Sequence, residues 1–279
     1  MQPASILKII DHAIFIGSSW FQVMIRKRMI RFKSDTPDTK HNYCAIFTTY
    51  HRQQNIDLVL RSLIKCKSIR KVIVINANPD CPIEQCMEKY PIDIDIIQTH
   101  EPKRPGYRWY IARNYQTEYD RFIALDDDTL LSPKQLHLLV TALERTPSAP
   151  QGIIGSRYPL KPYCYDQKEQ KSITEFYKSH DAIVDVIHQA YVVTGKHVSN
   201  FHRIANKLTS YDVMSPTSIG DDIIISHSGT EPPQINAVGR ILECPFSHFS
   251  GIAVHTEHNA ERRRCKVIRE IWDKKLCEW

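Results

Sequence analysis

Three consecutive carboxylates, Asp126, Asp127 and Asp128, are the strongest chemical signal in this sequence. Adjacent carboxylates repel one another, so a cation or a basic side chain is needed beside them. Hard divalent cations such as Mg²⁺ and Mn²⁺ prefer carboxylate oxygens and are commonly completed by the phosphates of a substrate. The triplet therefore predicts a metal site for a phosphate-bearing ligand; the alternative is a solvated acidic turn.

Two further polar groups follow apolar or turn-forming segments. Thr49, Tyr50 and Arg52 come at the end of an apolar run, and a hydroxyl, an aromatic ring and a guanidinium suit the ribose, base and phosphate of a nucleotide. An ordinary polar turn between a strand and a helix fits them equally well. Asp221 and Asp222 precede a second apolar run, where Asp222 could cap the next element.

Short apolar runs alternate with helical patterns and would position these groups. We expect strands over Cys44–Thr49, Lys71–Ile75, Asp93–Gln98, Arg121–Leu125 and Val184–Val193. Apolar residues at helical spacing predict helices over 56–64 and 136–143, the second starting at Ser132–Pro133, and 108–119 and 255–279 also have helical character.

Strands that alternate with helices predict an α/β fold with a mostly parallel sheet and helices on both faces. Such sheets bind ligands beyond the carboxyl ends of their strands, where both polar groups of the first half fall. We therefore expect a nucleotide-binding half over about 44–130, followed by a second half over 131–279. Together they form one domain over 41–279, after an N-terminal segment and linker over 1–40.

Composition excludes some classes of ligand site. The chain has only nine glycines among 279 residues and contains neither a Walker loop nor a G-x-G-x-x-G run, so the two glycine-rich ways of holding phosphate are absent. The net charge of +6 is too small and too dispersed to indicate nucleic acid as a partner.

The N-terminal segment leaves three interpretations open. Ile6–Ile25 is rich in apolar residues but carries Lys8, Asp11 and His12, and a basic run over 26–33 follows it. It could span a membrane with the rest of the chain in the cytosol, lie on a membrane surface, or pack on the domain. A contact with a membrane surface is therefore one expectation.

Five short segments, in order, resemble the exostosin-type glycosyltransferases. They are Thr-Thr-Tyr-His-Arg at 48–52, Lys-Val-Ile-Val-Ile-Asn-Ala-Asn at 71–78, Asp-Asp-Asp-Thr-Leu-Leu-Ser at 126–132, Asp-Asp-Ile at 221–223 and Glu-His-x-x-x-Arg-x-x-Cys at 257–265. The resemblance covers about 44–270. It implies a GT-A fold, Mn²⁺ or Mg²⁺ as cofactor, a UDP-sugar donor carrying N-acetylhexosamine, a glycan or glycolipid acceptor, and retention of the anomeric configuration.

The resemblance also implies roles for single residues. Tyr50 and Arg52 would contact the uridine and the diphosphate, Asn76 and Asn78 would lie near the uracil, and Arg113 would be a phosphate partner. Read without the resemblance, Arg113 also fits an exposed helix position paired with Glu118 or with nothing.

The remaining implied roles concern metal binding and catalysis. Asp128 would bind the metal, while Asp126 and Asp127 would hold ribose or sugar hydroxyls. Asp222 matches the catalytic acidic residue, and His258 and Arg262, four residues apart on one helix face, match a pair that contacts donor and leaving group. His258 and Arg262 also fit ordinary surface positions.

The sequence departs from the exostosin pattern before Asp221. The family has Asn-Cys-Glu-Asp where this chain has Ile-Gly-Asp-Asp at 219–222, so the cysteine that would pair with Cys265 is missing. We therefore expect a free Cys265, which favours a cytosolic or membrane-associated location over the Golgi or ER lumen. The competing functions are a catalytically inactive GT-A-like nucleotide- or sugar-binding protein and a nucleotidyltransferase, whose usual glycine-rich loop this chain lacks.

Overall fold

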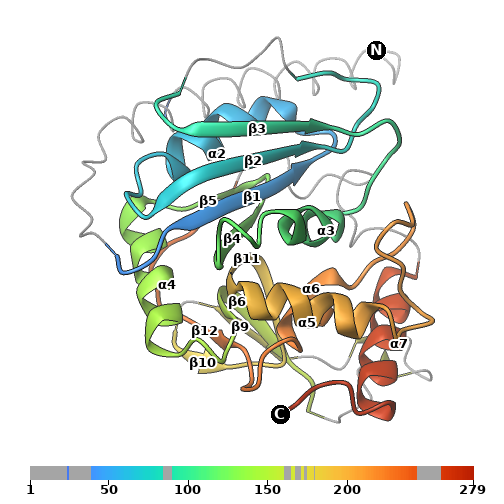
Figure 1. The fold of residues 1–279 in the computed structure, drawn as a ribbon. Helices are drawn as coiled ribbons and strands as arrows, with labels where there is room; N and C mark the ends of the chain where they lie inside the picture. The colour runs from blue at the N-terminus through green and yellow to red at the C-terminus, as the bar shows by residue number, and fades with distance from the viewer. Residues whose placement is uncertain are drawn as a thin grey trace, which may run out of the picture.

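A mixed sheet runs through the computed structural model of the chain, which describes residues 24, 39–83, 90–159, 165–166, 171–172, 175–178, 180–243 and 259–279 (Figure 1). In that part of the chain the sheet has nine strands. Four parallel strands form one side, in the order β4-β1-β2-β3. Their bounds are β1 Tyr43–Thr49, β2 Ile69–Asn76, β3 Asp93–Gln98 and β4 Arg121–Asp126. The four strands expected in the first half are confirmed.

The other side of the sheet is mixed. It comprises β6 Gln151–Arg157, β9 Glu175–Lys178, β10 Ala182–Ile183, β11 Val186–Thr194 and β12 Gln234–Ile235. β11 lies between β4 and β6 and is antiparallel to both. β6 therefore runs in the direction of β4, and its carboxyl end lies at the same edge of the sheet as Asp126. The beginning of β11 lies at this edge too.

Two short ladders complete the described strands. β5 Thr129–Leu130 pairs with β13 Leu242–Glu243, directly after the acidic triplet. β7 Tyr165–Asp166 pairs with β8 Lys171–Ser172.

Helices cover both faces of the sheet, as expected (Figure 1). One face carries α2 Ile56–Leu63, after the 3₁₀ turn η1 Gln53–Asn55, and α4 Pro133–Arg145. The other carries α3 Tyr107–Asn114, α5 Gly195–Ala205, α6 Asp221–Ser226 and α7 Ala260–Asp273. Because side chains alternate along a strand, Ile46 belongs to the core under α5 while Phe47 belongs to the core under α2.

The start of α4 fixes the loop that carries the acidic triplet. The Ser132 hydroxyl accepts a hydrogen bond from the Gln135 amide at 3.3 Å, and the Gln135 side chain accepts one from the Ser132 amide at 2.8 Å. Pro133 occupies the first turn. This reciprocal cap holds the chain immediately after β5 in one conformation.

α3 is shorter than the expected helix over 108–119 and ends at Asn114. The residues that follow make tertiary contacts instead. The Tyr115 hydroxyl donates to Asp95 at 2.6 Å, and the Gln116 amide donates to the Ser199 hydroxyl at 2.9 Å. These contacts to β3 and α5 replace another helical turn.

Cys265 on α7 is disulfide-bonded, which corrects the expectation of a free thiol. Its partner lies outside the described residues. A disulfide requires two Cβ atoms at the right separation and not a fixed place in the sequence, so a glycine at position 220 does not prevent it. The argument for a cytosolic location from a missing partner therefore fails.

Nearly all of the N-terminal segment, including the basic run over 26–33, lies outside the described residues. Within the ranges given above, none of the helices is both long enough and apolar enough to cross a membrane.

Glu270 ties α7 to the segment after α5, and we expect Glu270→Gln to destabilise the fold by about 1–2 kcal/mol at pH 7. Its carboxylate, 13% exposed, accepts hydrogen bonds from the amides of Thr209 (2.7 Å) and Ser210 (3.0 Å), and pairs with Lys274 at 2.5 Å. Burial opposes ionisation, but the hydrogen bonds from Lys274 and Ser210 outweigh it and lower the pKa of Glu270 to about 2.

The same contacts predict how this stabilisation depends on pH. An unfolded glutamate has a pKa of about 4.3, so the stabilisation is complete above that value and is lost as the pH falls towards about 2. Urea denaturation of wild type and variant at pH 7 and at pH 3 measures the difference. Asp273→Asn, an exposed change on the same helix, is the control. Equal stability of wild type and Glu270→Gln at pH 7 would contradict the prediction.

Candidate active site

The acidic triplet lies where β4 ends, and Arg52 at the end of β1 contacts two of its members. Arg52 Nη2 lies 2.8 Å from Asp127 Oδ1, and Arg52 Nη1 contacts Asp128 Oδ2. β1 and β4 are parallel neighbours with Thr48 opposite Asp126, which brings the two polar groups together at one edge of the sheet. The structure thus places Arg52, Asp127 and Asp128 in one cluster.

Arg108 on α3 joins the triplet to the second acidic pair. Its guanidinium, only 2% exposed, contacts Asp126 Oδ1 through Nη1 at 2.9 Å and Asp221 Oδ2 through Nη2 at 3.1 Å. Tyr191 covers it, with the ring centroid 5.0 Å from Cζ of the guanidinium. Sequence reasoning did not single out Arg108, and the predicted phosphate partner Arg113 is exposed on the same helix.

Asp222 is the second residue of α6 and is held by two basic side chains. Arg264 on α7 donates to both of its carboxylate oxygens, at 2.7 Å to Oδ1 and 2.6 Å to Oδ2. His188 Nδ1 lies 3.1 Å from Oδ2. Burial opposes ionisation of Asp222, but Arg264 and the hydrogen bond from His188 outweigh it and hold the pKa of Asp222 below its usual range. Asp222 is therefore ionised at neutral pH.

The pKa values of two neighbouring carboxyl groups, Asp127 and Asp221, are raised rather than lowered. Burial raises the pKa of Asp127 to about 7, although Arg52 opposes the shift, and the charge of Asp128 adds to it. Burial also raises the pKa of Asp221, and the charge of Asp222 contributes. In this cluster the five carboxyl groups of Asp126–Asp128, Asp221 and Asp222 face three guanidinium groups, those of Arg52, Arg108 and Arg264, so acidic groups outnumber basic ones.

The expected nucleotide contacts line the adjoining strand ends. Thr49 is buried and opposite Asn76 in the β1–β2 register, while the Tyr50 ring is exposed. The Asn76 amide donates to Gln98 at 2.7 Å, and its side-chain oxygen accepts from the Asn78 amide at 3.2 Å. Asn76 thus shapes the loop, and Asn78 beyond it is half-buried.

The chain that forms this cluster also matches a known family in sequence. A sequence profile described as the glycosyl transferase family 64 domain matches residues 43–274. The chain belongs to glycosyltransferase family 64. A search of curated proteins gave no match.

Solved structures resemble this family 64 chain in fold. GalNAc-T7 with UDP, GalNAc and Mn²⁺ superposes with a TM-score of 0.51 at 8% identity, over 75% of this chain and 44% of that one. The chain thus spans less than half the length of that protein. The mannosyltransferase PcManGT from Pyrobaculum calidifontis, in complex with GDP-Man and Mn²⁺, has a TM-score of 0.45 at 15% identity, over 83% and 68%. The expected GT-A-like α/β fold and glycosyltransferase class are confirmed.

Asp128 suits a cation that is held largely by phosphate oxygens. Within the described ranges no group of three or more His, Cys, Asp or Glu residues forms a protein-only metal cage. Asp128 Oδ2 contacts Arg52, while Oδ1 has only a 3.5 Å contact from the Thr129 hydroxyl. Mg²⁺ in enzymes usually keeps one or two carboxylates and takes its other ligands from substrate and water. The donor set and the surplus of carboxyl over guanidinium groups therefore fit a divalent cation at Asp128.

The structure does not bring every predicted residue to the cluster. Arg262 is exposed in the first turn of α7, and its neighbour Arg264 makes the contacts with Asp222. His258 lies outside the described residues. The sequence held a signal for both Arg108 and Arg264. Each is followed by apolar residues three and four positions later, and this helical spacing places the arginine on the buried face of its helix.

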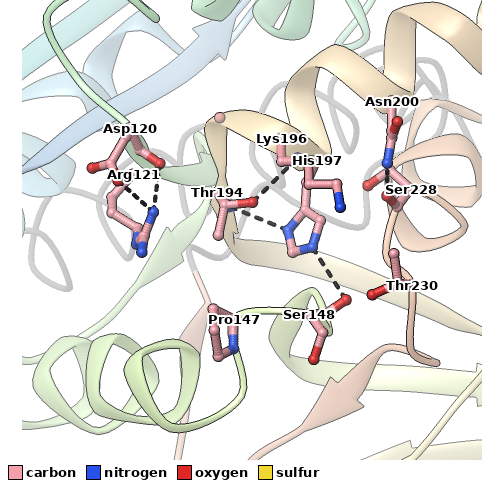
Figure 2. Close-up of a pocket in the computed structure, with 11 residues that line it drawn as sticks. Asp120, Arg121, Pro147, Ser148, Thr194, Lys196, His197, Asn200, Ser228 and Thr230 are labelled. Atoms are coloured by element: carbon pink, nitrogen blue, oxygen red, sulfur yellow. Dashed lines mark hydrogen bonds and ion pairs between the residues drawn. The ribbon is translucent and has the colours of Figure 1, made fainter.

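A pocket of this family 64 chain, drawn in Figure 2, is lined by none of the acidic residues of the cluster. It has a volume of about 420 Å³ and lies at the start of β4 and of α5, beside Asp120 and Gly195. Its His197 takes part in the cap of α5 with Thr194 and contacts the Ser148 carbonyl oxygen at 3.3 Å. Since Asp120 precedes β4 and Asp126 ends it, the pocket lies at the opposite edge of the sheet.

Proposed function

We propose that the chain transfers N-acetylhexosamine from a UDP donor to a glycan or glycolipid acceptor, with retention of the anomeric configuration, as an exostosin-type member of its family. One observation carries the proposal. Asp222 is held ionised by Arg264 and His188, and Arg108 connects its neighbour Asp221 to the triplet. A carboxylate suited to catalysis and a carboxylate suited to a metal thus border one site.

The donor would lie along the ends of β1 and β2, within 44–130. The exposed Tyr50 ring and half-buried Asn78 suit the base, and Arg52 can exchange its carboxylate partners for the diphosphate. GalNAc-T7, which shares the fold, was solved with UDP and Mn²⁺, and this supports the same pair here. Residues 131–279 would bind the acceptor.

The chain's own side chains would carry the catalytic charges. Sugar transfer passes through an oxocarbenium-like state, in which the anomeric carbon becomes positive. Ionised Asp222 would stabilise that charge or orient the acceptor hydroxyl, and the two hydrogen bonds from Arg264 fix its orientation. A divalent cation at Asp128 would stabilise the leaving diphosphate. Arg264 would hold Asp222 in this arrangement. The expected contacts of Arg262 and His258 with the donor and the leaving group stay predictions.

Thermal unfolding of the full chain with nucleotides tests the proposal. UDP with Mn²⁺ at about 100 times its Kd is expected to raise Tm by about 5 °C, because a ligand that binds only the folded state stabilises it by about 2.7 kcal/mol. GDP, CMP and ADP, and UDP with EDTA, are the controls and should shift Tm little. A UDP-N-acetylhexosamine hydrolysis assay follows. No shift with any nucleotide would contradict the proposal, and UDP binding without hydrolysis or transfer would favour an inactive sugar-binding protein.

A further inference from the structure

Phe176 on β9 is the most exposed large apolar side chain in the described part of the chain, at 70%. Its ring is nonetheless held in place from behind. It stacks on the imidazole of His188, with 5.2 Å between ring centroids and 12° between the planes. One face of the phenyl ring is covered by this contact, and the other is open to a ligand.

The strand register places this ring beside the candidate catalytic carboxylate. Phe176 is directly opposite Ser156 in the β9–β6 pair, so both side chains lie on the same face of the sheet. The Ser156 hydroxyl lies 3.0 Å from His188 Nε2, and His188 Nδ1 lies 3.1 Å from Asp222. Phe176 is therefore connected to Asp222 through His188, which contacts both. Ser156 lies near the carboxyl end of β6, at the edge of the sheet that carries the triplet.

The polar surroundings distinguish this surface from a protein-binding patch. Interfaces with proteins use contiguous apolar areas of several hundred Å². Here a single phenyl ring lies beside exposed Lys178, two residues further along β9, with His188 and the buried Ser156 behind it. One aromatic face with hydrogen-bonding groups around it matches a pyranose ring, which has apolar C–H faces and a polar rim.

We propose that Phe176, backed by His188, is the platform on which a pyranose ring of the acceptor stacks, with the acceptor hydroxyl directed towards Asp222. This inference rests on the proposed function and names the acceptor class, a carbohydrate with an unobstructed C–H face. Phe176 is a specificity-determining residue in this arrangement. His188 acts as a positioning residue, since it contacts both the platform and Asp222.

The test is binding of the full chain, with UDP and Mn²⁺ present, to an array of oligosaccharides that end in hexose, N-acetylhexosamine or hexuronic acid. Phe176→Ala is expected to weaken binding by at least about tenfold, or about 1.4 kcal/mol. Phe176→Trp should retain it, because the aromatic face remains. Leu138→Ala, which removes another exposed apolar side chain (40% exposed) on α4, is the matched control. UDP affinity of Phe176→Ala measures whether that variant is folded.

The outcomes separate this inference from the proposed function. Wild-type binding that Phe176→Ala leaves unchanged, or a wild-type chain that binds no oligosaccharide on the array, overturns the platform. With an oligosaccharide that is also an acceptor, Phe176→Ala should raise the acceptor KM much more than it lowers kcat. Binding that depends on Phe176 without any sugar transfer would support the platform and contradict the proposed function. Sugar transfer by Phe176→Ala with an unchanged acceptor KM would support the proposed function and contradict the platform.

Discussion

Asp222→Asn is expected to reduce the rate of sugar transfer by about 10²–10³-fold while UDP affinity stays within about twofold of wild type. The amide keeps the shape of the side chain but removes the negative charge that Arg264 and His188 hold at this position. Loss of one preorganised group that stabilises developing charge typically lowers kcat by about 10²–10³-fold. Single-turnover transfer and calorimetric titration with UDP and Mn²⁺ measure the two effects.

The Asp222 experiment has a matched control and a clear contrary result. Asp120→Asn changes an exposed aspartate at the opposite edge of the sheet and should leave transfer unchanged. Calorimetry shows whether Asp222→Asn is folded, because the UDP contacts come from other strand ends. Near-normal turnover by Asp222→Asn would show that another group supplies the catalytic charge.

Asp128→Ala is expected to weaken binding of UDP in the presence of Mn²⁺ by about 100-fold or more. A cation that neutralises the diphosphate contributes several kcal/mol, and Asp128 is the carboxylate proposed to hold it. Arg52 keeps Asp127 as a partner in this variant, so its half-buried guanidinium is not left unpaired. Calorimetry with UDP, with and without Mn²⁺, measures the loss.

Removal of the metal provides the control for Asp128. Wild type in EDTA should bind UDP as weakly as Asp128→Ala does, and adding EDTA to the variant should change nothing further. Asp128→Asn tests whether the charge rather than the side-chain volume matters. Mn²⁺-dependent UDP affinity that survives both substitutions would rule out the metal role of Asp128.

The parallel strands could be predicted from sequence because their signal is local. β3 has the expected bounds, Asp93–Gln98, and each end of β1, β2 and β4 lies within two residues of its expected position. Each is a short apolar or alternating run beside turn-forming residues. The capping box at Ser132 is also a local signal, because it involves only Ser132 and Gln135. Local signals of this kind place the triplet at a strand end.

Pairing between distant segments could not be predicted in the same way. The strand expected near 184–193 exists as β11, but nothing in its composition indicates that it is antiparallel and lies between β4 and β6. That placement is what brings His188 to Asp222. The helix periodicity around Arg108 and Arg264 indicated burial, but the identity of their carboxylate partners depends on tertiary structure.

Arg108 has a consequence for how the protein folds. Its buried charge is satisfied by Asp126, which lies near it in sequence, and by Asp221, which lies more than ninety residues further along. A partly folded chain that orders only the first half would bury this guanidinium with half of its ion pairs, which is strongly unfavourable. The folding of the two halves is therefore energetically coupled through Arg108. All of the ion pairs at the site form only when both halves are folded.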